Sequence, residues 1–361
     1  MNKIFDNIQI GKLDIRNRLV RSATWENMAT ETGHMTEKLY NIYEELADSE
    51  IGLIITGYAN VVKEEKPNPG MMGIYEDSFI EEYKVLTDLV HQKGSKIVMQ
   101  IAYGGTKTTY NVGERIIFAP SEVAELGTNT LGKEMTLEEI KEMVVAFGQA
   151  ARRVRESGFD GVELHAAHTY LINQFLSPYY NRRTDEYGGN LENRMKFLVE
   201  VCQEMKKQTA EDYPLIVKLT ATEFIENGQT FEDTKIIAKK LEEIGVTAIE
   251  LSGNIHGKAS KMSGEVFDGY EIKKEGYFTE YAKVISEEIN IPVITVGGFR
   301  EPGQIEELLN ESKIEAIAIS RPLICEPNLA KRWAKGDIRK AKCVSCSRCR
   351  TSEGNYCTVF K

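Results

Sequence analysis

Short apolar runs alternate with longer amphipathic stretches along most of the 361 residues. Eight runs have the length and continuous apolar character of strands that are buried on both faces of a parallel sheet. They cover residues 18–23, 52–57, 96–101, 161–165, 214–220, 248–252, 292–297 and 316–320. The amphipathic stretches predict helices over 36–48, 77–93, 136–157, 190–208, 231–244, 278–289, 301–310 and 326–335. The third helix has a marked start, because Thr136 and Glu139 have the spacing of a capping box.

Eight successive strand–helix units are the pattern of an α/β fold of the (β/α)8 TIM barrel type. We therefore predict a barrel over residues 1–335, followed by a short cysteine-containing C-terminal tail over 336–361. A doubly wound sheet is the alternative, but it usually carries a G-x-G-x-x-G loop after its first strand, and "SATWENMATETG" contains none. Two connections, 57–76 and 102–135, are long for either fold.

In a barrel of this type the chemistry is expected where the strands end and the following loops begin. The residues at those eight positions are polar, glycine or aromatic, whereas the strands themselves are apolar. They are Thr24 and Trp25, Tyr58 and Asn60, Gln100 and Tyr103, His165 and His168, Lys218 and Thr220, Ser252 and Gly253, Gly297 and Gly298, and Ser320 and Arg321. This concentration predicts a ligand site at the barrel mouth.

The last two strand ends have the chemistry of a phosphate site. Gly297 and Gly298 allow backbone N–H groups to approach an anion, and Ser320 and Arg321 add a hydroxyl and a planar cation near a helix start. Barrels commonly bind phosphate with the loops after strands seven and eight. The alternative is an ordinary glycine turn beside a surface arginine.

Lys218 interrupts an otherwise apolar strand. Burying an ammonium group without an anionic partner is costly, so we expect its partner to be a ligand that becomes electron-rich. The alternative is a lysine whose chain extends from the barrel mouth to water.

The overall charge limits the class of partner. A formal net charge of −10 argues against a nucleic-acid or anionic-membrane partner, because attraction to phosphate groups needs a basic surface. The N-terminus contains no apolar run of a signal peptide, and no stretch reaches the roughly 18 apolar residues of a membrane helix. We expect a soluble, cytoplasmic protein that acts on a small molecule.

The segment "HAAHTYLINQF", residues 165–175, contains two histidines three residues apart. Such a pair can bind zinc from one helical face, but no third ligand lies nearby in the sequence, and Glu163 is expected to be a core or capping group. Either histidine alone could also be an ordinary core residue. Their position at a strand end, with Tyr170 following, favours a substrate site.

Several segments, in order, resemble the Old Yellow Enzyme family of FMN-dependent NADH:flavin oxidoreductases. The longest is "HAAHTYLINQFLSPYYNRRTDEYGGNLENR" (165–194), and the others are "NRLVRSATW" (17–25), "KIVMQIAYGGTK" (96–107), "GFDGVELHAAH" (158–168) and "LIVKLTA" (215–221). The resemblance extends over about residues 1–335. Within the family the chain looks closer to the bacterial branch that includes the barrel domain of 2,4-dienoyl-CoA reductase than to the yeast-type enzymes.

This resemblance implies that FMN binds over the barrel mouth and that NAD(P)H donates electrons to it. Gln100 would hydrogen-bond the flavin pyrimidine edge, and Lys218 would lie beside flavin N1 and O2, where a cation supports the reduced flavin. His165 and His168 would bind the carbonyl oxygen of an activated alkene, and Tyr170 would donate a proton to its α-carbon. His165 would also contact FMN, and the remaining contacts would be Ala23, Thr24, Trp25, Tyr58, Gly297, Gly298, Ser320 and Arg321. Trp25 departs from the relatives, which have cysteine, threonine or histidine there.

Four of the six cysteines lie within the tail: Cys343, Cys346, Cys349 and Cys357. Four thiolates this close can bind a [4Fe–4S] cluster or zinc. The larger relatives carry such a cluster just after the barrel, although their C-x2-C-x3-C spacing is one residue longer than the C-x2-C-x2-C here. Three interpretations remain open: a cluster served by a separate redox partner protein, a structural zinc, or a remnant that binds nothing. Cys202 and Cys325 stand apart in the sequence.

Three functions follow from these observations. The first is reduction of the activated C=C bond of an α,β-unsaturated carbonyl compound. The second is a non-redox barrel enzyme, such as an aldolase or isomerase, in which Lys218 acts as Schiff-base or acid–base group. The third is a barrel subunit that exchanges electrons with a partner through the cysteine tail. A homo-oligomer is compatible with each.

Overall fold

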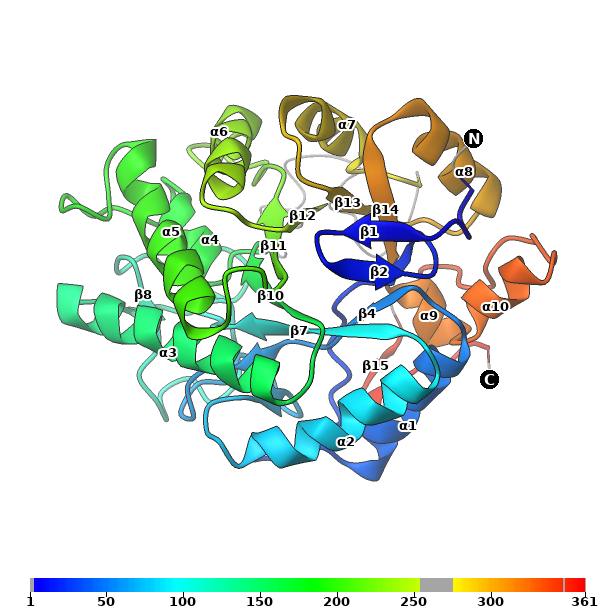
Figure 1. Ribbon diagram of the computed structural model, residues 1–361. Helices are drawn as coiled ribbons and strands as arrows, with labels where there is room; N and C mark the ends of the chain where they lie inside the picture. Colours follow the sequence, from blue (N-terminus) through cyan, green and yellow to red (C-terminus); the bar gives the residue numbers. More distant parts are fainter. Residues whose placement is uncertain (1–2, 254–274, 347, 361) are drawn as a thin grey trace.

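Eight parallel strands close into a barrel surrounded by helices (Figure 1). The computed structural model describes residues 3–253, 275–346 and 348–360. Around the barrel the strands are β3 (Leu19–Arg21), β4 (Leu53–Ile55), β7 (Lys96–Ala102), β10 (Gly161–Ala166), β11 (Leu215–Thr220), β12 (Ala248–Ser252), β13 (Val293–Val296) and β14 (Ile314–Ile319). The pairing of β14 with β3 and of β7 with β10 closes the ring. The TIM barrel predicted from the eight apolar runs is confirmed.

The helices pack their apolar faces against the outside of this ring (Figure 1). They are α1 (Glu37–Asp48), α2 (Phe79–Gln92), α3 (Leu137–Glu156), α4 (Leu171–Leu176), α5 (Leu191–Gln208), α6 (Phe231–Glu243), α7 (Thr279–Glu288), α8 (Pro302–Glu311), α9 (Arg321–Cys325) and α10 (Leu329–Ala334). The predicted capping box before α3 is present. The single helix predicted over 326–335 is wrong at its start: the chain forms α9 and then α10, because Pro327 disfavours a helical conformation at Glu326.

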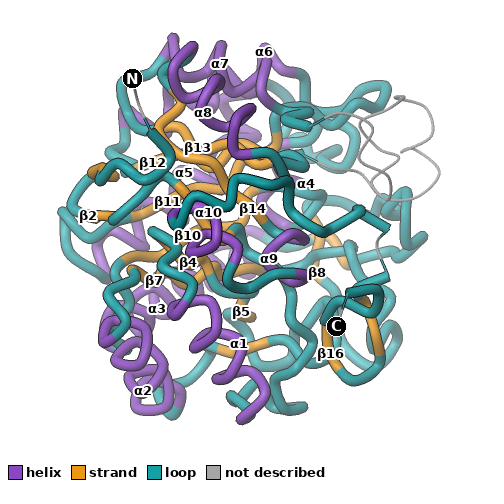
Figure 2. Tube along the Cα trace, turned by 90° about the vertical axis from the view of Figure 1, so that its right-hand side faces the viewer, coloured by secondary structure: helices purple, strands orange, loops and turns teal. Residues whose placement is uncertain are grey.

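An N-terminal hairpin closes one end of the barrel. Its strands β1 (Ile8–Ile10) and β2 (Leu13–Ile15) pair antiparallel, and their apolar side chains join the apolar residues inside the barrel in one cluster. Figure 2 places β2 at one end of the barrel and β8 and β16 at the opposite end. Ligand access is therefore confined to the end where the strands terminate.

Short strands of the connecting loops cover that open end. They are β5 (Ala59–Asn60), β6 (Met72–Gly73), β8 (Phe118–Ala119) and β9 (Lys133–Glu134), all from the two long loops, and β15 (Arg350–Thr351) and β16 (Gly354–Asn355), which form a hairpin in the C-terminal tail. The backbone N–H of Asn355 donates to the carbonyl of Glu26, and the amide of Asn27 donates to the carbonyl of Thr351. The tail hairpin is therefore fixed to the loop that follows β3.

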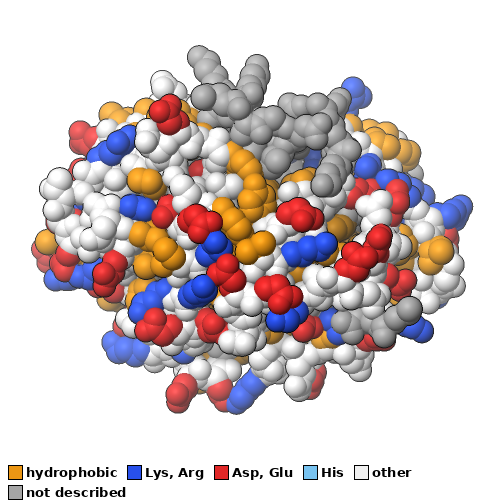
Figure 3. Space-filling model, turned by 90° about the horizontal axis from the view of Figure 1, so that it is seen from above, with side chains coloured by type: hydrophobic (Ala, Val, Ile, Leu, Met, Phe, Trp, Pro, Cys, Tyr) orange, Lys and Arg blue, Asp and Glu red, His pale blue; other side chains and the backbone are white. Residues whose placement is uncertain are grey.

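The face over α6, α7 and α8 carries basic and acidic side chains interspersed (Figure 3). Ion pairs such as Lys239–Glu288 and Lys313–Glu287 account for part of this mixture. Among the described residues, no helix is both long and apolar enough to cross a membrane.

Candidate active site

A cavity of about 350 Å³ opens at the carboxyl ends of the barrel strands. This volume lies in the range of ligand pockets. Eight residues predicted from the sequence line it: Ala23, Trp25, Tyr58, Gln100, His165, His168, Tyr170 and Lys218. The fold therefore gathers the three predicted catalytic side chains and six of the predicted FMN contacts around one space, with His165 in both groups.

The expectation that a ligand is the partner of Lys218 is wrong. Its Nζ atom lies 2.9 Å from Oε1 of Glu250 on the neighbouring strand β12, and it donates to the hydroxyl of Ser22 at 2.8 Å. Lys218 and Glu250 are directly paired in the sheet register, which puts both side chains on the inner face of the barrel. The buried ammonium group is thus compensated within the protein, while its side chain still lines the cavity.

Below the cavity, Glu163 continues this network. Gln100 donates to Oε2 of Glu163 at 2.5 Å, and Glu163 and Glu250 are hydrogen-bonded to each other. Complete burial and the nearby charge of Glu250 raise the pKa of Glu163 well above its usual value. Burial acts in the same direction on Glu250, but Lys218 and the hydrogen bonds outweigh it, so the pKa of Glu250 is lowered. A neutral Glu163 therefore donates its proton to an ionised Glu250.

The two histidines of the segment 165–175 differ in environment. Burial, with a smaller contribution from Lys218, lowers the pKa of His165 well below its usual value. Its Nδ1 atom accepts a hydrogen bond from the backbone N–H of Ala167, which leaves the proton of the neutral ring on Nε2. His168, at the left-handed φ of 59°, places Nε2 2.9 Å from the hydroxyl oxygen of Ser252.

Tyr170 lies against His165, with ring centroids 4.4 Å apart. Burial raises the pKa of Tyr170 to about 12, and a hydrogen bond from Tyr58 opposes that rise. The amide of Asn68 donates in turn to the Tyr58 hydroxyl at 2.6 Å. Tyr170 thus carries a proton at neutral pH, and the donor chain behind it can stabilise the phenolate that remains after the proton leaves.

The predicted phosphate-binding residues do not line this cavity. They lie at the ends of the neighbouring strands β13 and β14: Gly297, Gly298, Ser320 and Arg321. Gly298 has a φ of +79°, which favours glycine. The Ser320 hydroxyl lies 2.7 Å from that of Thr24, and the Arg321 side chain hydrogen-bonds Tyr277. Thr24 is likewise outside the cavity, so the predicted contacts form two groups, one at the cavity and one at these strand ends.

Seven further residues line the cavity, and the sequence analysis identified none of them individually. They come from the two long loops and from the tail: Asn68, Lys107, Thr108, Thr109, Gly127, Thr128 and Arg350. Loop length was the available signal, since long loops beside a barrel mouth are often functional. Nothing in the sequence indicated that Arg350 lines the cavity, because its position depends on the contact between the tail hairpin and the loop after β3.

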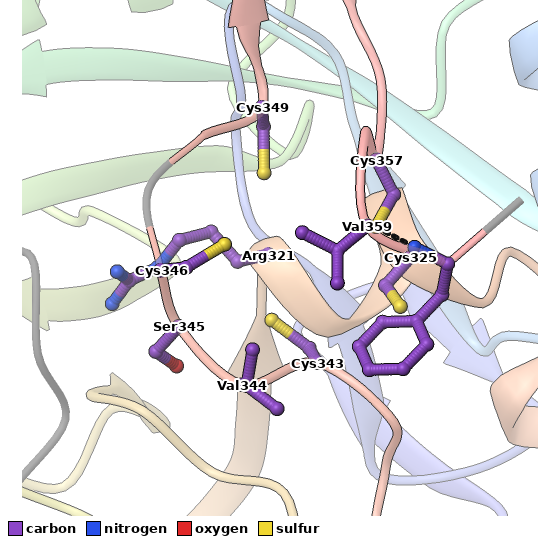
Figure 4. Close-up of a pocket in the computed structure, with 10 residues that line it drawn as sticks. Arg321, Cys325, Cys343, Val344, Ser345, Cys346, Cys349, Cys357 and Val359 are labelled. Atoms are coloured by element: carbon purple, nitrogen blue, oxygen red, sulfur yellow. Dashed lines mark hydrogen bonds between the residues drawn. The ribbon is translucent and has the colours of Figure 1, made fainter.

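A second cavity lies beside Arg321 and gathers five thiols (Figure 4). The four tail cysteines line it together with Cys325, the last residue of α9, which the sequence had left apart. Burial raises the pKa of Cys325 to about 12, and its thiol hydrogen-bonds Cys357. The backbone N–H of Phe360 donates to the sulfur of Cys357 at 3.3 Å. Within the described residues, no group of three or more histidine, cysteine or acidic side chains is arranged to hold a metal ion.

Comparison with known proteins supports the interpretation of the cavity as a flavin enzyme site. Residues 3–339 match the model of the NADH:flavin oxidoreductase / NADH oxidase family. The chain is 37% identical to an NADH oxidase of Thermoanaerobacter brockii over 95% of its length and 52% of the relative's. It is 36% identical to an NADPH dehydrogenase of Bacillus subtilis (strain 168), over 92% of this chain and 94% of the relative.

A solved structure of 2-naphthoyl-CoA reductase in complex with 2-naphthoyl-CoA superposes with a TM-score of 0.86 at 27% identity, covering 94% of this chain and 53% of the other. The chain thus spans about half the length of the larger relatives and resembles their N-terminal barrel domains. These matches favour a flavin enzyme over the non-redox alternative. The chain belongs to the Old Yellow Enzyme family of NADH:flavin oxidoreductases.

Proposed function

We propose that the chain reduces the activated C=C bond of an α,β-unsaturated carbonyl compound, with NAD(P)H as reductant and FMN as cofactor. The observation that carries this proposal is that His165, His168 and Tyr170 line the same cavity as Gln100 and Lys218. Hydrogen-bond donors for a carbonyl oxygen and a protonated phenol thus face the space above the residues expected to hold the flavin. In the net reaction the alkene gains one hydride and one proton, and NAD(P)H becomes NAD(P)⁺.

The residues present fit FMN. Gln100 and Lys218 offer an amide and a buried ammonium group at the floor of the cavity, suited to the polar edge of an isoalloxazine ring. The strand ends carrying Gly298, Ser320 and Arg321 offer a phosphate the backbone N–H groups and the cation that it needs. When bound there, FMN would supply the hydride chemistry, taking hydride from NAD(P)H and passing it to the alkene β-carbon.

The carbonyl oxygen of the substrate would be held by His165. Because the ring is neutral and Nδ1 already accepts from Ala167, Nε2–H is the donor that remains. A neutral donor polarises the carbonyl group without transferring a proton to it. His168, which lines the same cavity, would complete the binding of that oxygen.

Tyr170 would act as the general acid. Its pKa of about 12 keeps it protonated at neutral pH, and the Tyr58–Asn68 chain would stabilise the phenolate that it becomes. Stacking against His165 places its ring beside the group that binds the carbonyl oxygen. The proton would therefore be delivered close to the activated end of the alkene.

The purified protein tests this proposal directly. We expect flavin absorbance, release of FMN on denaturation, bleaching of the flavin by NADH or NADPH without oxygen, and its return on addition of 2-cyclohexenone. Purified protein that neither carries nor takes up FMN would contradict the cofactor. A flavin that is reduced by NAD(P)H but is not reoxidised by any unsaturated carbonyl compound would contradict the reaction.

The thiol cavity supports a second proposal, that the tail binds an iron–sulphur cluster. The four tail thiols line one cavity together with Cys325, and four thiolates gathered in this way are the ligand set of a [4Fe–4S] cluster. Such a cluster would carry single electrons, and Cys343, Cys346, Cys349 and Cys357 would bind it.

A further inference from the structure

Arg350 belongs to the tail in sequence but to the active-site cavity in space. It begins β15, directly opposite Asn355 of β16 in the hairpin register. The side-chain amide of Asn355 donates to the carbonyl of Trp25, and its backbone N–H donates to Glu26 at 2.7 Å. These contacts fix the hairpin at the barrel mouth and set the point from which Arg350 extends.

The guanidinium group of Arg350 lies over the indole ring of Trp25, 5.9 Å from its centroid. The Trp25 ring is itself held by a hydrogen bond of 2.9 Å from Nε1 to the carbonyl of Pro69. Both side chains line the cavity that also contains His165 and Tyr170. Arginine stacked on an aromatic face keeps the edge of its planar donor group available for an anion.

The positive charge of Arg350 also affects the pKa of Tyr170, the proposed general acid. Burial dominates the pKa of Tyr170 and raises it, and the positive charge of Arg350 acts in the opposite direction on Tyr170 and on Tyr58. Arg350 is therefore near the part of the cavity where the alkene would be protonated.

Arg350 differs from the other two cations that line the cavity. Lys107 is paired with buried Glu125 at 2.6 Å, and Lys218 is paired with buried Glu250 at 2.9 Å. In the part of the chain that the structure describes, no carboxylate is paired with Arg350, whose side chain is exposed toward the cavity mouth. Among the described residues that line the cavity, Arg350 is thus the positive charge that no carboxylate compensates.

We infer that Arg350 binds a carboxylate group of the substrate, so that the chain prefers unsaturated carbonyl compounds that carry such a group away from the carbonyl held by the histidines. This inference rests on the proposed ene-reduction. A guanidinium group offers two parallel N–H donors that match the two oxygens of a carboxylate. Arg350 is accordingly a specificity-determining residue, and the tail completes the substrate site of the barrel.

Two esters of the same alkene test the inference. Monomethyl fumarate carries one carboxylate and dimethyl fumarate carries none, while both retain an ester carbonyl group for the histidines. The anaerobically reduced, FMN-loaded protein is mixed with each ester, and flavin reoxidation is followed. We expect Arg350→Met to lower the second-order rate constant of flavin reoxidation about tenfold for the monoester. For the diester this rate constant should change less than twofold.

Two further variants separate charge from geometry and from the tail itself. Arg350→Lys keeps the charge without the planar donor pair and should recover part of the lost preference for the monoester. Arg348→Met removes an exposed arginine of the same tail that does not line the cavity, and it should leave the ratio of the two rates unchanged. A binding measurement supports the kinetics: 4-hydroxybenzoate, but not its methyl ester, should bind more weakly to Arg350→Met when flavin absorbance is titrated.

An equal loss with both esters in Arg350→Met would overturn the inference, because it would assign Arg350 to holding the tail. A slower reduction by NAD(P)H with unchanged ester preference would also overturn it and would assign Arg350 to the nicotinamide nucleotide. If the proposed ene-reduction itself is wrong, the experiment gives a different result. In that case the reduced wild-type protein is reoxidised by neither ester, so no ratio exists to be changed.

Discussion

Lys218 and Glu250 form an ion pair of 2.9 Å inside the barrel, with side chains that are 3% and 0% exposed. They lie on adjacent strands in direct register, and Ser22 contacts both. A buried pair is sensitive to the loss of one partner, because the remaining charge is left in a medium that solvates it poorly. The positive charge that faces the cavity floor is therefore part of a compensated network rather than an isolated lysine.

Replacing Glu250 alone should destabilise the protein more than replacing the pair. We expect Glu250→Leu to lower the free energy of unfolding by about 3–5 kcal/mol, since it leaves the Lys218 ammonium group buried and unpaired. The double variant Lys218→Met/Glu250→Leu should recover at least half of that loss. Urea unfolding at a fixed excess of FMN measures both. Equal destabilisation by the single and double changes would show that the two charges are not coupled.

Because Glu163 is protonated in the folded protein, the stability of Glu163→Gln relative to wild type should depend on pH. Because its pKa is raised in the folded protein, Glu163 keeps a proton that the unfolded chain releases above its normal pKa of about 4.3, so wild-type stability falls as pH rises. Glu163→Gln removes this term and keeps a hydrogen-bond donor. Its stability relative to wild type should rise by up to about 1.4 kcal/mol per pH unit between about pH 5 and 7.

Urea unfolding at several pH values measures this difference. The matched control is Glu192→Gln, which changes an exposed carboxylate at the start of α5. The control should run parallel to wild type. A Glu163→Gln curve that is also parallel to wild type would mean that Glu163 is ionised in the folded protein.

Removing the Tyr170 hydroxyl should separate the two half-reactions. Tyr170→Phe should slow reoxidation of the reduced flavin by 2-cyclohexenone about 100-fold or more, as expected for loss of a general acid, and should change reduction by NAD(P)H less than about twofold. Tyr110→Phe is a suitable control, since its hydroxyl bonds Glu31 and does not line the cavity. Stopped-flow absorbance measures both half-reactions, and equal slowing of the two would exclude the assigned role.

Metal analysis should distinguish the interpretations of the tail. Protein purified without oxygen should contain about four iron atoms and little zinc per chain, and Cys343→Ala should lose the iron. Cys202→Ala should keep it, because Cys202 is buried in α5, outside the thiol cavity. Cys325→Ala should also keep it, because the four tail thiols suffice as ligands. Zinc at about one atom per chain, or no metal in freshly prepared protein, would contradict the cluster.

Much of the site could be predicted where the fold itself brings strand ends together. His165, Lys218 and Gln100 follow from local patterns, because every barrel strand ends at the same mouth. The residues predicted to bind phosphate were expected at the same barrel mouth as the other strand-end residues, but Ser320 and Arg321 do not line the active-site cavity. The loop residues could not be predicted one by one, since side chains such as Lys107 reach the cavity only through the path of a long loop.

The sequence by itself determined the barrel. Continuous apolar runs of strand length and amphipathic helices are local patterns, and eight of them in alternation have one common solution that buries their apolar faces. Tertiary structure alone decided which charges meet and where the tail lies. The partner of Lys218 is 32 residues away, and Asn355 contacts a carbonyl 330 residues earlier in the chain. Such pairings depend on barrel closure and on loop paths, and no local periodicity encodes them.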